Sequence, residues 1–475
     1  MKQYKRISDI QSDLKNGLVT CVDLVEHYLQ NIQAKKDLNA FLEVWDEEAR
    51  TKAIAIDEKI AQKCAGKLAG VVIALKDNLA YKNHKVSCAS KILDGFESLY
   101  SATVVQRLEQ EDAIFIGRTN CDEFAMGASN ENSAFGPVKN AIDPSRVPGG
   151  SSGGSAVAVA ADMCHCALGS DTGGSIRQPA AFNGIYGFKP TYGLVSRWGL
   201  LAYASSFDQI GPMAKSLEDI ALLTQIIAGV DANDASMLQL EAPNFTEFKA
   251  TSKITFSVMN EALFNEGLDP QIKQHFETLI NTLLDQGHKV QYFDFPLLEH
   301  LVPTYYVLTT AEASSNLSRY SGMLYGHRST KGTDLESTIT LSRSEGFGPE
   351  VKRRILLGTF VLSSDHYDAY YEKAQKVRRK ILDETNKILE SSDVILLPTT
   401  STPAFKLGEK SKDPIAMYLA DLFTVQANLS GNPAISIPLF KNDKNLPIGV
   451  QLMTKHQNEQ ELFNIAHLLE NISTQ

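Results

Sequence analysis

The sequence contains no segment with the length and apolar character of a membrane span. No run reaches the roughly 18 consecutive apolar residues that a spanning helix needs, and residues 1–8 lack the apolar core of a secretory signal peptide. These absences argue against a membrane role, and we expect a cytoplasmic protein.

An excess of positive charge and regularly spaced cysteines are also lacking. Lys and Arg number 46 against 56 Asp and Glu, which gives a net charge of −10 at pH 7. A nucleic-acid backbone is bound through concentrated Lys and Arg, so any nucleic-acid role would fall to a partner.

The six cysteines are scattered, which favours reduced thiols. Cys164 and Cys166 flank His165, but no second ligand cluster lies nearby in the sequence, so we predict no metal site.

Helix and strand signals alternate along the 475 residues, of which 43% are hydrophobic. Thr20 followed by Asp23, and Ser216 followed by Asp219, are capping patterns that open helices. Short apolar runs predict buried strands at residues 70–75, 113–117, 164–169, 254–258, 289–294, 394–397, 434–438 and 448–452.

This alternation predicts the α/β class, with a single large mixed β-sheet sandwiched between helices. We expect one domain over residues 1–475, because no convincing linker interrupts the pattern. Helices are expected at the N-terminus, over about 1–62. The polar stretch at about 327–348 is expected to form a mobile loop near the functional site.

Glycine and serine alternate twice between Val147 and Pro179, first in residues 149–155 and again in residues 171–175. Glycine allows positive φ and a close approach of a ligand to the backbone. A flexible linker would have the same composition. However, the apolar residues 156–161 follow at once and are typical of a buried helix. We therefore interpret both segments as turns that present hydroxyl groups.

A serine becomes a nucleophile only when a base accepts its proton, and histidine is the usual base. Of the ten histidines, only His84 lies in a turn context. Gly150–Gly154 matches the G-x-S-x-G elbow of α/β-hydrolases, but that elbow follows a strand, whereas residues 143–148 are polar and contain two prolines. Phosphate binding is weakly supported, because no Gly-Lys-Ser/Thr sequence ends the loop.

Lys76 is the remaining candidate base, since it stands at the end of the apolar run Gly70–Leu75. Burial disfavours the charged form of lysine and lowers its pKa, and a Ser-Lys pair is a known alternative to Ser-His-Asp. Taken alone, a lysine in this position is more often a surface residue or half of a structural ion pair than a base. Its combination with two Gly-Ser turns favours the catalytic interpretation.

The three motifs Lys76–Asn78, Gly149–Ser155 and Asp171–Arg177 together resemble the amidase signature family. The resemblance implies the fold of that family and a Ser-Ser-Lys catalytic set, in which the first serine lies on a cis peptide. It further implies an acyl-enzyme mechanism without a metal ion.

Carried over by position, the resemblance makes Ser175 the nucleophile, Ser151 the bridging serine and Lys76 the base, with Ser152 in a supporting role. Backbone N–H groups at glycine-rich turns stabilise a developing oxyanion. The resemblance implies that these groups belong to Thr172, Gly173, Gly174 and Ser175.

Further stretches, at residues 196–212, 311–317, 342–348 and 367–374, are similar to the family of A subunits of bacterial glutamyl-tRNA(Gln)/aspartyl-tRNA(Asn) amidotransferases. In that family the A subunit hydrolyses glutamine without a cofactor. Ammonia passes to a B subunit, which uses ATP and magnesium to amidate Glu or Asp on tRNA, and a small C subunit completes the heterotrimer. The acidic net charge agrees with tRNA being held mainly by the B subunit.

The same resemblance places Arg354 on the glutamine α-carboxylate, Asp421 on the α-ammonium group and Tyr305 against the substrate. Arginine suits a carboxylate because its fork pairs bidentately. Arg354 and Asp421 are also compatible with solvated helix faces. Gln426 departs from the apolar residue or proline that is usual in the family, which puts the local pocket wall in question.

Two other functions stay open. One is a stand-alone amidase that acts on another small or fatty amide, and it predicts activity without partners. The other is a catalytically inactive scaffold, which the presence of all three catalytic residues disfavours.

Overall fold

The computed structural model describes residues 1–240, 244–249, 253–264, 266–410 and 414–473. In these ranges eleven strands form one sheet, in the order β1-β3-β2-β4-β6-β5-β10-β11-β9-β7-β8. The strands are β1 (Phe41–Val44), β2 (Val72–Lys76), β3 (Ile114–Thr119), β4 (Cys166–Asp171), β5 (Tyr186–Lys189), β6 (Gln209–Ala214), β7 (Thr255–Met259), β8 (Lys289–Phe293), β9 (Val394–Pro398), β10 (Ala434–Lys441) and β11 (Pro447–Met453). Parallel and antiparallel pairs alternate in blocks, which confirms the predicted mixed sheet.

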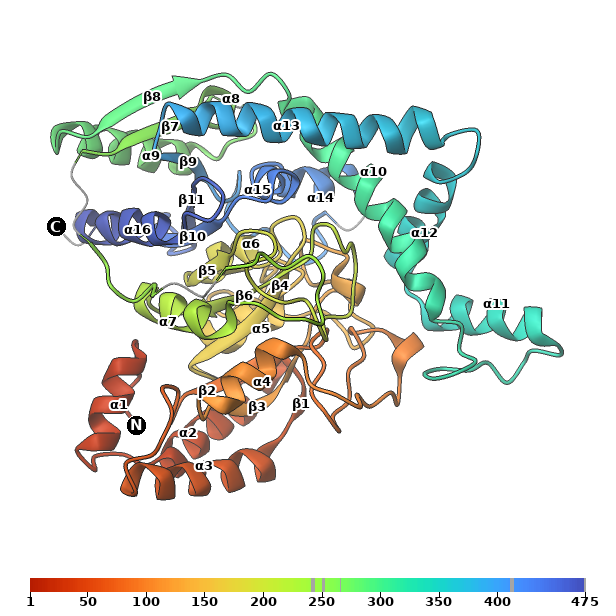
Figure 1. Ribbon diagram of the computed structural model, residues 1–475, viewed down its shortest axis with the longest axis horizontal. Coiled ribbons are helices and arrows are strands. Elements are labelled where there is room, and N and C mark those ends of the chain that lie inside the picture. The colour runs from red at the N-terminus through yellow and green to blue at the C-terminus, as the bar shows by residue number, and fades with distance from the viewer. Residues whose placement is uncertain (241–243, 250–252, 265, 411–413, 474–475) are drawn as a thin grey trace.

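Helices cover both faces of this sheet (Figure 1). The α-helices are α1 (Ile7–Lys15), α2 (Cys21–Ala34), α3 (Asp46–Ala61), α4 (Thr103–Gln110), α5 (Gly153–Ala160), α6 (Arg177–Asn183), α7 (Leu217–Ile227), α8 (Asn260–Leu263), α9 (Pro270–Asp285), α10 (Leu298–Asn316), α11 (Leu335–Gly346), α12 (Pro349–Val361), α13 (Lys373–Glu390), α14 (Pro414–Tyr418), α15 (Val425–Ser430) and α16 (Glu459–Ser473).

Strand β2 shows why both faces are covered. Successive side chains of a strand point to opposite faces. Ile73 and Leu75 belong to one hydrophobic core, which also includes side chains of α4 and α7, whereas Val72 and Ala74 belong to a second core, which includes side chains of α2, α3 and α5. By the same alternation, Lys76 shares the face of Val72 and Ala74.

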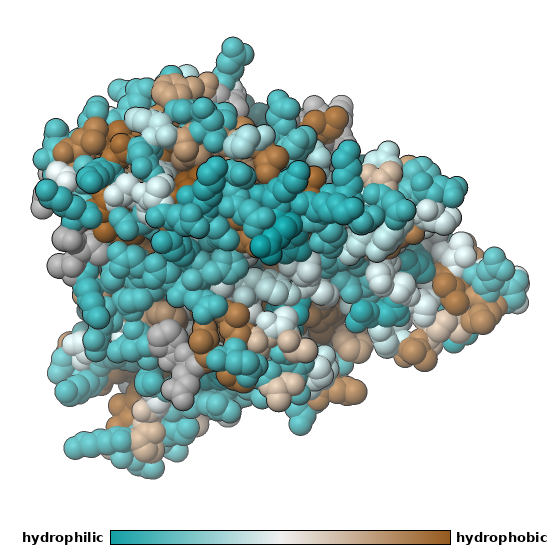
Figure 2. Space-filling view, turned by 45° about the horizontal axis from the view of Figure 1, so that its top comes forward, coloured by the Kyte–Doolittle hydropathy of each residue, from teal (hydrophilic) through white to brown (hydrophobic). Residues whose placement is uncertain are grey.

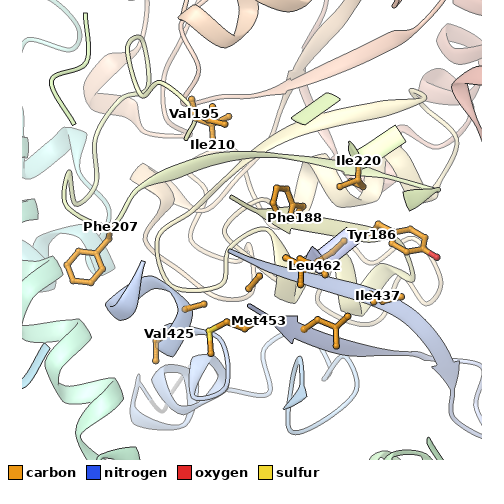
Figure 3. Close-up of a cluster of buried hydrophobic side chains, with 14 of the residues drawn as sticks. Tyr186, Phe188, Val195, Phe207, Ile210, Ile220, Val425, Ile437, Met453 and Leu462 are labelled. Atoms are coloured by element: carbon orange, nitrogen blue, oxygen red, sulfur yellow. The ribbon is translucent and has the colours of Figure 1, made fainter. Parts of the chain in front are cut away.

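Side chains from several sheet strands and covering helices pack together in the middle of the molecule. Figure 3 shows Tyr186 and Phe188 of β5, Ile437 of β10 and Leu462 of α16 close together, and all four are buried. The ring of Phe188 also lies 4.9 Å from that of Phe463. This packing joins β5 in the first half of the chain to β10 and α16 in the second.

The N-terminal segment is not entirely helical, which corrects the expectation for residues 1–62. The capping box at Thr20 and Asp23 forms and opens α2 as predicted. Residues 41–44, however, form the edge strand β1, which pairs antiparallel with β3. Pairing with β3 supplies backbone hydrogen bonds that a four-residue strand lacks by itself, so its own sequence gives little signal.

The expected loop at 327–348 is also wrong in part, because residues 335–346 form α11. Asp334 accepts a hydrogen bond from Ser337 N, and the Ser337 side chain bonds back to the Asp334 backbone, so the helix has a capped start. The polar composition reflects a helix with few buried residues. In Figure 1 it lies at the far right end of the molecule. Mobility of the surrounding segment stays a prediction.

Most of the surface in Figure 2 is hydrophilic, and apolar groups are scattered over it in small clusters, one of them at the right end. No helix in the described ranges is both long and apolar enough to span a membrane.

Candidate active site

Lys76 lies at the centre of a cluster of hydroxyl groups. Its Nζ is 2.7 Å from Ser151 Oγ and 2.9 Å from both Ser152 Oγ and Ser170 Oγ. The side chain is completely buried. Burial lowers the pKa of Lys76 from its usual value, and the fields of Cys121 and nearby carboxyl groups only partly oppose this effect. The structure therefore places Lys76 beside both serines of the first turn.

Ser151 follows a tight turn whose backbone conformation and close packing require glycine at positions 149 and 150. The peptide bond between Gly150 and Ser151 is cis, as the family resemblance implies. A Cβ on Gly150 would overlap the Asp122 carboxylate, and Gly149 has a φ of +80°. Asp122 is buried, and its carboxylate accepts hydrogen bonds from the backbone of Asn130 and residue 132. Close packing of Gly150 against this carboxylate, together with the positive φ of Gly149 and its approach to Pro179, explains why the sequence places two glycines before the serine.

Asp171 organises the second turn. Its carboxylate accepts hydrogen bonds from Gly174 N at 2.8 Å and Ile176 N at 3.2 Å, and it pairs with the buried Arg177. The carbonyl oxygen of Ser175 accepts a hydrogen bond from Ser152 N at 3.2 Å, so the two turns lie side by side. The Ser175 hydroxyl has no hydrogen-bond partner among the described residues. It is thus available to a substrate.

The structure corrects one of the predicted oxyanion donors. The Gly174 N–H is occupied by the Asp171 carboxylate, so it does not point toward a substrate in this conformation. In the part of the chain that is described, the amides of Thr172, Gly173 and Ser175 donate to no protein acceptor. A Cβ on Gly173 would lie 2.6 Å from the Tyr305 ring, which requires glycine there. The sequence pattern alone does not distinguish a glycine amide held by a carboxylate from one left free.

Arg354 is buried, so the alternative of a solvated helix face is wrong for this residue. Its Nη1 donates to the Tyr203 hydroxyl at 2.7 Å, and its Nε pairs with Glu350 at 2.8 Å. The guanidinium also lies over the rings of Tyr306 and Tyr418. Burial lowers the pKa of Arg354, but the neighbouring Tyr203, Tyr306 and Glu350 raise it by more. The side chain is therefore a fixed cation.

Asp421 is buried as well, and burial raises the pKa of its carboxyl group to about 8. The charge of Arg354 acts against this rise. Tyr305 is buried on α10, and its ring lies at 90° to that of Phe207. Gln426 donates a hydrogen bond to Thr385 of α13 at 3.1 Å, so its amide is directed at a helix.

A cavity of ≈ 580 Å³ lies beside Arg354, and among the described residues its lining includes neither the three proposed catalytic residues nor Tyr305 and Asp421. Arg354, Glu350 and Tyr418 line it together with Ser129. A Cβ on Gly150 would lie 2.7 Å from Ser129 N, so this part of the cavity wall adjoins the first serine turn. Residues 344–348 line this cavity too, whereas the nearness of the whole stretch 327–348 to the catalytic residues stays a prediction.

Sequence reasoning missed two groups that contact the predicted site. Ser170 contacts both Lys76 Nζ and the Asn78 side chain at 2.9 Å. A hydroxyl residue at the end of an apolar strand was a usable signal. Thr424 donates to the Gly173 carbonyl oxygen from 251 residues away, and no local pattern indicates such a contact.

The histidine between Cys164 and Cys166 is buried and pairs with a carboxylate. His165 Nε2 is 2.8 Å from Asp219, and Cys166 Sγ lies within 4.8 Å of both. This is the one group of three potential ligands found in the described ranges. His165 precedes β4, whereas Ser170 contacts Lys76 near the other end of that strand. The group is therefore separate from the serine cluster.

A family model described as Amidase matches residues 23–463. This chain belongs to the amidase family. That membership and the mixed sheet agree with the family resemblance of the three sequence motifs.

Three similar proteins align with nearly the whole length of this amidase. It is 50% identical over 465 residues to the A subunit of glutamyl-tRNA(Gln) amidotransferase from Coxiella burnetii, an alignment that covers 98% of the chain and 96% of the relative. The crystal structure of the corresponding A subunit from Thermotoga maritima is 40% identical, with a TM-score of 0.78 and coverage of 97% and 95%. The peptide amidase of Stenotrophomonas maltophilia is 27% identical, with a TM-score of 0.82 and coverage of 98% and 96%.

Proposed function

We propose that this amidase is the glutamine-hydrolysing subunit of a tRNA-dependent amidotransferase. The observation that carries the catalytic part is the contact of buried Lys76 with Ser151. The turn of Ser175 is joined to this serine turn through Ser152 N, and the Ser175 hydroxyl has no partner among the described residues. The end-to-end similarity to the A subunits of two glutamyl-tRNA(Gln) amidotransferases supports the substrate and the assembly.

In the proposed mechanism, neutral Lys76 accepts a proton from Ser151, which accepts one from Ser175. Ser175 Oγ attacks the side-chain amide carbon of glutamine and forms a tetrahedral intermediate. The amides of Thr172, Gly173 and Ser175 stabilise its oxyanion. The relay then returns a proton to the departing ammonia, which leaves a γ-glutamyl ester on Ser175. Water activated by the same relay hydrolyses this ester to glutamate.

The two ends of glutamine are held by opposite charges. Arg354 pairs with the α-carboxylate, and its stacked rings fix the plane of the guanidinium. Asp421 pairs with the α-ammonium group, whose charge favours the ionised carboxylate. Tyr305 packs beside Gly173 and closes the pocket near the reacting carbon.

The proposed assembly is a heterotrimer with B and C subunits, and the chain acts as a single amidase domain in the cytoplasm. The B subunit uses ATP and magnesium, and ammonia released by this chain converts Glu-tRNA(Gln), with Asp-tRNA(Asn) as a second acceptor. The net charge of −10 supports tRNA binding mainly by the B subunit.

A stand-alone amidase is the second candidate, and the structural similarity to a peptide amidase favours it. This alternative predicts high activity of the isolated chain on unrelated amides. The proposed function predicts selectivity for glutamine and stimulation by partners.

The test is ammonia release from glutamine by the purified chain, alone and then with B and C subunits, ATP, magnesium and Glu-tRNA(Gln). We expect strong stimulation in the complex and loss of glutamine hydrolysis in Ser175→Ala. The Ser175→Ala complex should still form Gln-tRNA(Gln) from added ammonium. High activity of the isolated chain on unrelated amides would assign it to stand-alone amidases.

A further inference from the structure

The turn that carries the proposed nucleophile is connected to both proposed binding sites for the ends of glutamine. We call residues Thr172–Ser175 the oxyanion loop. One connection starts at the Thr172 side chain and the other at the Gly173 carbonyl group. The first passes through Asp208 and Tyr203 and the second through Thr424, all of them buried residues that the mechanism above does not use.

The first connection runs through Asp208. Thr172 Oγ1 donates to Asp208 Oδ1 at 2.6 Å, and Asp208 Oδ2 accepts from the amides of Tyr203 at 2.9 Å and Ala204 at 3.0 Å. Asp208 is buried, so these hydrogen bonds are not in competition with bulk water. The carboxylate therefore holds the oxyanion loop against the segment that carries Tyr203.

Tyr203 continues this connection to Arg354. Its hydroxyl accepts a hydrogen bond from Arg354 Nη1 at 2.7 Å and donates one to Thr309 Oγ1 at 2.9 Å. The Arg354 guanidinium also lies 5.4 Å from the Tyr203 ring centroid. A shift of Arg354 toward a bound carboxylate would thus act on Tyr203, Asp208 and Thr172 in turn.

The second connection runs through Thr424. Its Oγ1 donates to the Gly173 carbonyl oxygen at 2.6 Å and lies 3.0 Å from the Asp421 carbonyl oxygen. The Thr424 amide also donates to the Asp421 carbonyl group at 3.0 Å. A Cβ on Gly174 would overlap the Thr424 side chain, so the two segments are in close contact. Thr424 therefore fixes the peptide between Gly173 and Gly174 relative to Asp421.

We propose that Asp208 and Thr424 are positioning residues that couple the binding of both ends of glutamine to the geometry of the oxyanion loop. This inference rests on the proposed function. Its consequence is that the α-carboxylate and α-ammonium groups accelerate the chemical step as well as binding the substrate. Binding energy from parts of a substrate remote from the reacting atom is used in this way when it orders the catalytic groups.

The test compares Thr424→Val, which removes the hydroxyl, with Thr424→Ser, which keeps it. A misplacement of catalytic groups by about 1 Å costs on the order of 100-fold in rate. We expect kcat for glutamine to fall about 10- to 100-fold in Thr424→Val, with KM changed less than about threefold, and to stay near wild type in Thr424→Ser. A merely structural role would lower the melting temperature in both variants without this split.

A second readout uses butyramide, which has the amide but lacks both α groups. In the wild type, kcat for glutamine should exceed kcat for butyramide by a wide margin. This ratio should shrink in Thr424→Val and in Asp208→Asn, because the connection to the bound ends is broken. Asp208→Asn keeps the size of the side chain and is informative even if the valine variant folds poorly.

The outcomes separate this inference from the proposed function. Wild-type glutamine hydrolysis that survives Ser175→Ala would reject the proposed function itself. Wild-type hydrolysis that requires Ser175, together with unchanged kcat in both Thr424→Val and Asp208→Asn, would overturn only the coupling. An increase in KM at constant kcat would also overturn it, because the two residues would then act on binding alone.

Discussion

The partners of Lys76 are neutral, namely three hydroxyl groups and the Ser170 carbonyl oxygen, and this distinguishes it from the ion-paired lysines of the chain. Ser151, Ser152 and Ser170 surround its amine, and no carboxylate is within hydrogen-bonding distance of Nζ in the described ranges. By contrast, Lys59 pairs directly with Asp112, and its pKa is raised. Burial without a paired carboxylate favours the neutral amine, which is the form that accepts a proton.

Removing the Lys76 amine should abolish acylation while the fold persists. We expect Lys76→Ala and Lys76→Met to lose at least about a thousandfold in glutamine turnover, because the serine relay then has no base. Ammonia release measures turnover, and circular dichroism with a thermal melt checks the fold. Near-normal turnover in either variant would show that lysine is not the base.

Asp421 should make glutamine binding dependent on pH. Burial raises the pKa of its carboxyl group to about 8, so in the free enzyme it is protonated below that pH and must ionise to pair with the ammonium group. Below pH 8 each pH unit then weakens glutamine binding by up to about tenfold. We expect KM to fall as the pH rises from about 6 to 8. In Asp421→Asn this dependence should disappear, and an unchanged slope would assign it to another group.

Arg354 and its neighbour Arg353 form a matched pair for testing carboxylate binding. Arg354 is buried in the cavity wall, whereas half of the Arg353 side chain is exposed. Arg354→Ala should raise KM for glutamine by about 30-fold or more, the equivalent of a charged hydrogen bond of roughly 2 kcal/mol or more. Arg353→Ala should stay within about threefold. The reaction with added ammonium bypasses this site, and an equal loss there would indicate a structural role.

At the scale of elements, the proposed substrate arginine depends on how closely α10 and α12 pack. Gly358 of α12 faces the carbonyl group of Thr310 on α10, and a Cβ there would overlap that oxygen. Tyr305 lies on α10 and Arg354 on α12, so this contact sets the distance between two residues proposed to bind glutamine.

Gly358→Ala should therefore destabilise the protein although alanine is the better helix former. The propensity gain of about 1 kcal/mol is outweighed by overpacking, which costs about 1–3 kcal/mol and moves α12. We expect a lower melting temperature and a raised KM for glutamine. Leu356→Ala on the exposed side of the same helix is the control and should change stability by less than about 0.5 kcal/mol. A stabilised Gly358→Ala protein with normal KM would contradict the close-packing explanation.

For the whole molecule, strands with continuous apolar runs could be predicted from sequence, whereas strands that depend on their neighbours could not. Strand β6 contains Pro212, which disfavours a strand, yet it lies between β4 and β5 in the sheet. In the site, Lys76 was predictable because a lysine ends a buried strand. Asp208 and Thr424 were not, since their partners lie 36 and 251 residues away in the sequence.

The proposed function depends above all on one covalent step, in which Ser175, activated through Ser151 by Lys76, forms an ester with glutamine. Rapid quenching of the assembled complex during turnover, followed by mass spectrometry of the peptides, detects this ester. We expect a γ-glutamyl group on Ser175 in the wild type and none in Lys76→Ala. A γ-glutamyl group on another residue, or equal labelling of Ser175 without Lys76, would contradict the mechanism.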